Sequence, residues 1–163
     1  MTHLHKSLTI LTASVIIAAA SLVILPFDAN ASRGAAPLEG TWLTQVRILD
    51  CASKQVMAGP FPGLIAFHAG GTVSETGPSL PASTRGPAHG SWELAGNRTY
   101  KIRVIFQRFD LNGFFIGTQA IRADLALAKD TATYIANGTF ELHDAAGTPV
   151  GSGCSRVDGT RFS

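Results

Sequence analysis

The chain has 163 residues, a formal net charge of +2 and two cysteines. So small a positive charge gives no argument for binding nucleic acid or an anionic membrane surface. The length is enough for one domain with a hydrophobic core of its own.

The first 31 residues have the pattern of a secretory signal peptide. A short start containing Lys6 precedes residues 8–25, which carry no charge, and Ala29-Asn30-Ala31 forms a small-x-small cleavage site. Cleavage there would leave residues 32–163 as one exported domain, periplasmic or secreted, without a stable membrane anchor. The alternative is an uncleaved anchor, because the apolar run is just long enough to span a bilayer.

The rest of the chain reads as strands separated by Gly, Pro and Asn turns. Asn112-Gly113, between two alternating runs, is the strongest hairpin signal. Alternation and the content of β-branched and aromatic residues predict eight strands. These are Gly40–Asp50, Gly63–Ala69, Thr72–Thr76, His89–Leu94, Thr99–Asp110, Phe114–Ala128, Thr131–Asp144 and Val150–Phe162.

The strand predicted at residues 99–110 shows the pattern most clearly, with apolar side chains on one face and polar ones on the other. The apolar face carries Tyr100, Ile102, Val104 and Phe106. One buried and one wet face are typical of an antiparallel sheet. Closing a series of hairpins into a ring removes both free edges. We therefore predict an all-β, eight-stranded, antiparallel up-and-down barrel.

The two cysteines suggest how the ring closes. Cys51 ends the first strand and Cys154 lies in the last, and an even count in an exported chain favours one disulfide. Two free thiols or a two-ligand metal site are the alternatives. If the cysteines face each other across antiparallel strands, paired residue numbers sum to 205, and Thr44 lies opposite Arg161.

Two short motifs at the ends of the domain resemble the lipocalin and wider calycin pattern. They are Gly40-Thr41-Trp42 at the first strand and Gly159-Thr160-Arg161-Phe162 at the last. The resemblance implies that Trp42 plugs the closed end of the barrel and that Arg161 packs over it. The chain also resembles exported bacterial lipocalin-like proteins without a known activity. The segments that carry this second likeness are Phe61-Pro62-Gly63-Leu64, Gly70-Gly71-Thr72 and Arg85 to Trp92.

The loop from Gly77 to Ala88 is the most unusual segment, because it is long and contains three prolines. Long loops in compact domains tend to be lids or binding loops. We expect it at the end opposite Trp42, with Arg85 placed to pair with an anionic or carbonyl group. The alternative is a stiff connection. The candidate ligand-binding residues are Arg85, His89, Trp92, Tyr100, Phe106 and Tyr134.

Other polar residues give weaker signals. No two histidines have metal-ligand spacing, so we expect neither a metal nor another cofactor. His89 and Glu93 have the same parity and could act as an acid–base pair. The basic residues Lys101, Arg103 and Arg108 are interpreted as the solvated outside of a strand.

Three functions stay open. The leading hypothesis is binding of a small hydrophobic or amphipathic ligand inside the barrel. The second is a barrel filled by its own side chains, with a structural or interaction role. The third is an enzyme of the barrel-cyclase or isomerase kind. An interior of about 300 Å³ or more would favour ligand binding over a filled barrel.

Overall fold

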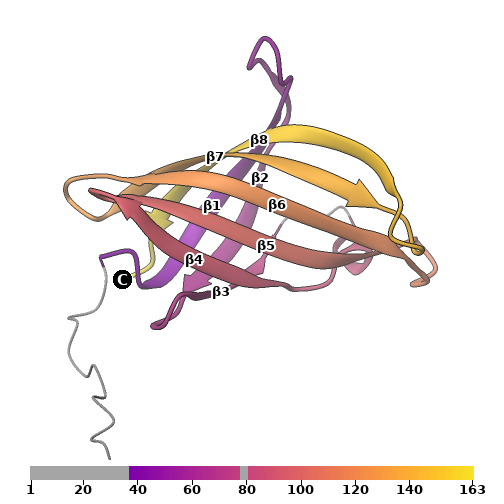
Figure 1. The fold of residues 1–163 in the computed structure, drawn as a ribbon, viewed down its shortest axis with the longest axis horizontal. Coiled ribbons are helices and arrows are strands. Elements are labelled where there is room, and N and C mark those ends of the chain that lie inside the picture. The colour runs from indigo at the N-terminus through magenta and orange to yellow at the C-terminus, as the bar shows by residue number, and fades with distance from the viewer. Residues whose placement is uncertain (1–36, 78–80) are drawn as a thin grey trace, which may run out of the picture. The chain divides into compact units, whose positions relative to one another are not determined.

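The computed structural model describes residues 37–77 and 81–163. The predicted signal peptide lies outside the described residues. The chain forms eight antiparallel strands that pair in sequence order and close into one ring (Figure 1). They are β1 (Gly40–Leu49), β2 (Val56–Phe67), β3 (Thr72–Thr76), β4 (Ala88–Gly96), β5 (Thr99–Phe109), β6 (Phe115–Leu127), β7 (Thr133–His143) and β8 (Pro149–Arg161). The predicted fold class is confirmed.

The barrel has two different ends. The turns after β2, β4 and β6 lie at the end where β1 begins and β8 finishes, on the left in Figure 1. The turns after β5 and β7, and the segment that leads into β4, lie at the other end. We call these the plugged end and the open end. No helix in the described ranges is long and apolar enough to cross a bilayer.

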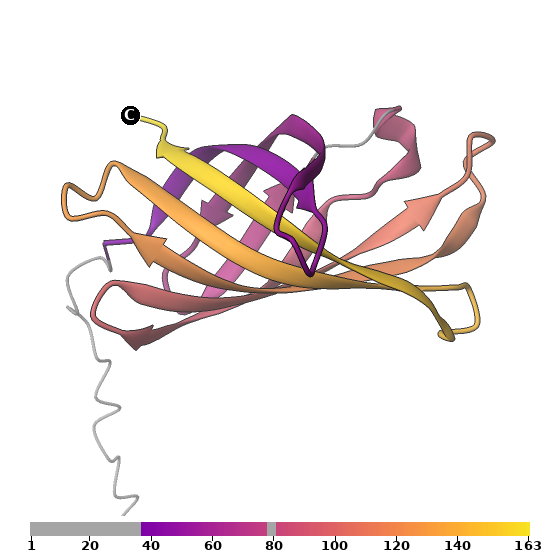
Figure 2. The ribbon, with the colours of Figure 1, turned by 90° about the horizontal axis from the view of Figure 1, so that it is seen from above.

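The ring closes between β1 and β8, which run side by side in Figure 2. Trp42 pairs with Arg161 and Leu49 with Cys154, so paired residue numbers sum to 203 rather than the predicted 205. The predicted seam register is therefore wrong by two residues. The disulfide is confirmed, with a Cα–Cα distance of 5.2 Å between Cys51 and Cys154. The register differs because Cys51 lies beyond the last residue of β1, in the turn that follows it.

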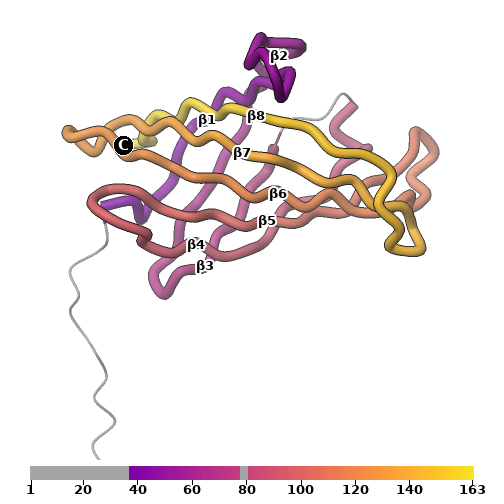
Figure 3. The backbone as a smooth tube through the Cα atoms, turned by 45° about the horizontal axis from the view of Figure 1, so that its top comes forward, coloured from indigo at the N-terminus to yellow at the C-terminus, as the bar shows by residue number. Residues whose placement is uncertain are grey.

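The second strand begins seven residues earlier than predicted, at Val56 instead of Gly63. Its first part contains Pro60 and Pro62, which are rare inside sheets. β3 is short and pairs only with residues 64–67 of β2. Residues 56–63 therefore belong locally to an edge strand, where proline is tolerated. With the end of β1 they form a hairpin that projects from the barrel, at the top of Figure 3.

Along each strand, every second side chain points into the interior of the barrel. The predicted apolar face of β5 is confirmed, since Tyr100, Ile102, Val104 and Phe106 are all buried. On β8, glycines make room for the rings of β7. A Cβ at Gly159 would lie 2.2 Å from Cε1 of Tyr134, so only glycine allows that ring to fold across β8.

The candidate site in the barrel interior

The plugged end is filled by aromatic rings. Trp42 is fully buried, and its indole nitrogen donates a 3.0 Å hydrogen bond to the carbonyl of Leu38. The Arg161 guanidinium lies 4.2 Å from the Trp42 ring centroid. It also donates to the backbone carbonyls of Pro37, Glu39 and Thr131. The predicted placement of Trp42 at the plugged end, with Arg161 over it, matches this geometry.

A cluster of edge-to-face rings extends this plug. Trp42 contacts Tyr134 at 5.0 Å between ring centroids, Phe67 contacts both Tyr134 and Trp92, and Trp92 contacts Tyr100 at 5.7 Å. The Trp92 indole nitrogen donates to the carbonyl of His68 at 3.1 Å. These rings fill their part of the interior, and both indole nitrogens donate to backbone carbonyls.

A cavity of about 220 Å³ remains on the other side of the cluster. Most of its walls are apolar, with Val46, Ile65, Val104, Phe106 and Ile121 among the lining residues. Tyr134 is the one member of the aromatic cluster that also lines the cavity. The interior therefore has a filled half and a hollow half.

A buried ion pair lies at the wall of this cavity. Arg85 donates to the Glu75 carboxylate, and the two side chains are only 7% and 11% exposed. The Arg85 guanidinium also stacks 3.7 Å from the Phe106 ring centroid. The pair leaves no room beside Gly77, where a Cβ would lie 2.0 Å from Oε1 of Glu75.

Burial changes the acid–base properties of this wall. Loss of solvation raises the pKa of Glu75, although the Arg85 guanidinium opposes the shift. Burial also raises the pKa of Tyr134, and the Glu75 carboxylate adds to that rise.

Thr44 is 3% exposed and lines the same cavity. Its hydroxyl oxygen is a buried polar atom without a hydrogen-bond partner among the described residues.

The six predicted ligand-binding residues divide into three groups. Arg85, Phe106 and Tyr134 line the cavity together. Trp92 and Tyr100 are buried in the aromatic cluster and are absent from the cavity wall. His89 is exposed on the outer face, because its neighbours Ala88 and Gly90 take the inward positions of β4.

Arg85 and His89 also differ from expectation in their partners. The sequence predicts that Arg85 is available to a ligand at the open end, but its guanidinium already forms an ion pair with the Glu75 carboxylate. Glu93 is exposed beside Arg103, so His89 and Glu93 share a face that is outside the barrel. Neither can act on a molecule held in the cavity. Within the described ranges, no group of three or more His, Cys, Asp or Glu side chains is placed to hold a metal.

Sequence reasoning missed Glu75 and Thr44 as members of the site. A signal existed for both, because Glu75 has the parity of buried Val73 and Thr44 has the parity of Trp42. Polar side chains more often face solvent, but the pleat of β1 and β3 places these two inside. No family model matches the chain, and no curated protein matches it.

Proposed function

We propose that this protein is an exported binding protein that holds one small, mainly apolar ligand in the barrel cavity. The observation that carries the proposal is the cavity itself, which lies beside a fully packed aromatic cluster in the same interior. The disulfide supports a non-reducing compartment, periplasmic or extracellular. The contact between Trp42 and Arg161 supports the resemblance to lipocalins.

The volume limits the size of the ligand. About 220 Å³ is below the ~300 Å³ at which pockets for drug-sized molecules begin, and above the ~150 Å³ of a cavity that admits benzene. The ligand is then a single-ring aromatic or a short aliphatic molecule. The unpartnered Thr44 hydroxyl and the Glu75–Arg85 pair favour one that carries a polar group.

Binding of small probes tests the proposal. We expect toluene and p-cresol to bind the wild-type protein in ligand-observed NMR and to raise its melting temperature. Ala136→Leu should abolish binding, because Ala136 is buried and lines the cavity. Ala126→Leu is the matched control, since Ala126 is an exposed residue on the neighbouring strand, next to the partner of Ala136.

A filled barrel with a structural or interaction role is the second candidate, and the modest volume favours it. In that case no probe binds the wild-type protein. Ala136→Leu then raises the melting temperature by filling the void, with no binding activity to lose. Equal binding by wild-type protein and Ala136→Leu would place the probe outside the cavity and overturn the proposal.

A further inference from the structure

A second hollow lies on the outside of the barrel. It has a volume of about 880 Å³ and crosses the outer faces of β5, β6, β7, β8 and β1. Lys54 and Val56, from the projecting β1–β2 hairpin, form one edge. We call this hollow the outer groove. Its charged lining consists of six basic residues, Arg47, Lys54, Lys101, Arg103, Arg122 and Arg156, and two acidic ones, Asp124 and Asp158.

Strand register brings these charges into two adjacent rows across the sheet. One row runs Arg47, Arg156, Asn137, Asp124 and Lys101, and the other runs Leu49, Cys154, Thr139, Arg122 and Arg103. Each row contains two arginines directly opposite each other, Arg47 with Arg156 and Arg103 with Arg122. Like charges in that position are destabilising.

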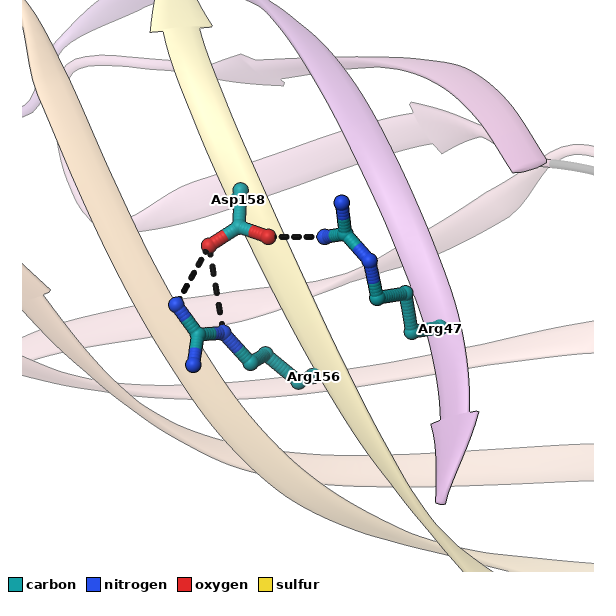
Figure 4. Close-up of polar contacts among 3 residues, drawn as sticks. All are labelled: Arg47, Arg156 and Asp158. Carbon is teal, nitrogen blue, oxygen red and sulfur yellow. Dashed lines mark hydrogen bonds and ion pairs between the residues drawn. The ribbon is translucent and has the colours of Figure 1, made fainter. Parts of the chain in front are cut away.

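The first arginine pair has its own counter-ion. Asp158 accepts from Arg47 through one carboxylate oxygen and from Arg156 through the other, at 3.0 Å for the Arg156 Nη2 atom (Figure 4). All three side chains are partly shielded. At this end of the outer groove one carboxylate therefore bridges the two guanidinium groups.

The second arginine pair, Arg103 and Arg122, has no such shared partner within residues 37–77 and 81–163. Glu93 approaches Arg103 only to 3.8 Å, from β4, and Glu141 approaches Arg122 to 3.4 Å, from β7. Both arginines are more than 60% exposed, so these ion pairs are screened by solvent. Lys101 lies in the next row, directly opposite Asp124 of β6 and Glu93 of β4, and forms no ion pair with either among the described residues. Three cations thus face the outer groove here, with Asp124 beside them, and no carboxylate in the described part of the chain bridges Arg103 and Arg122 as Asp158 bridges the first pair.

We propose that the outer groove binds a small molecule carrying more than one phosphate or sulfate group, with one group held between Arg103 and Arg122. Two adjacent guanidinium forks match the geometry of a tetrahedral oxyanion. The volume exceeds that of one such ion, and Lys101 and Lys54 are further cations in the lining of the same hollow. Lys54 lies in the β1–β2 hairpin, and the Cys51–Cys154 bond attaches this hairpin to β8. The site is separate from the interior cavity and does not depend on the function proposed for it.

Isothermal titration calorimetry of the intact protein with inorganic tripolyphosphate tests this site. Arg122→Gln should weaken binding by about tenfold or more, because it removes one fork of the pair. Arg122→Lys keeps the charge and should lose affinity to a lesser degree, since a lysine cannot bind bidentately. Lys129→Gln is the matched control. It removes one exposed charge in the turn between β6 and β7, outside the outer groove.

The outcomes separate a built site from general attraction. Equal losses in Arg122→Gln and Lys129→Gln, or no binding by wild-type protein, would overturn the proposal. Vesicles of phosphatidylethanolamine with and without phosphatidic acid distinguish the source of the phosphate. If wild-type protein binds the acidic vesicles and Arg122→Gln does not, the phosphate belongs to a lipid headgroup. If only tripolyphosphate binds, the ligand is a soluble anion.

Discussion

Replacing Trp42 with alanine should be among the most destabilising single changes in this barrel. The side chain is fully buried, so its loss opens a large void beside Tyr134. Removing a buried tryptophan typically costs about 3–5 kcal/mol. The lost hydrogen bond to Leu38 and the lost contact with Arg161 are part of that cost, at about 1 and about 0.5–2 kcal/mol.

Urea unfolding monitored by circular dichroism measures this change. Trp42→Phe separates the contributions, because it keeps a ring in the plug but removes the donor to the Leu38 carbonyl. We expect Trp42→Phe to cost about 1–3 kcal/mol, clearly less than Trp42→Ala. A loss below about 1 kcal/mol for Trp42→Ala would mean that the aromatic plug does not support the fold, and the reasoning from burial would be refuted.

The remaining predictions concern the disulfide and the buried ion pair. Replacing Cys51 and Cys154 with serine should lower the free energy of unfolding by up to about 4.7 kcal/mol, because the bond closes a loop with a sequence separation of 103. An unchanged midpoint of urea unfolding would contradict this prediction. The folded-state pKa of Glu75 is raised, so its contribution to stability is greatest below the ordinary value of 4.5 and falls as pH rises through that value toward the folded-state pKa. The stability of wild-type protein relative to Glu75→Gln should therefore decrease from pH 4 to pH 7, and a constant or growing difference would show that burial does not dominate. Arg85→Ala should destabilise by about 3–5 kcal/mol, since it leaves Glu75 buried without a partner, whereas a melting temperature equal to wild type would mean that the pair is solvated.

Much of the fold was predictable because local signals agreed with one another. Turn residues separated the strands, alternation identified the buried face of β5, and the motifs at Trp42 and Arg161 identified the plugged end. The start of β2 was not predictable from propensity. Pro60 and Pro62 are acceptable there only because β3 is too short to pair with that part of the strand.

The candidate site was less predictable, because it depends on register between distant strands. Arg85 was expected at the open end, but its partner Glu75 could be identified only once β3 and β4 were aligned. His89 faces outward because it has the opposite parity to Ala88 and Trp92, which are buried on the inner face of β4. The pair of facing arginines in the outer groove also depends on the register between two strands. Arg103 and Arg122 are well separated in sequence, and neither residue alone indicates a pair.

The seam between β1 and β8 sets an order of events during synthesis. Trp42 and Arg161 are partners, so the ring cannot close until almost the whole barrel has left the ribosome. Until then β1 has one unpaired edge, and Cys51 has no thiol to react with. Such distant pairings fold slowly and leave partly formed sheets open to other chains. The pairing that closes the ring therefore comes last, after a period in which the edge of β1 is open to other chains.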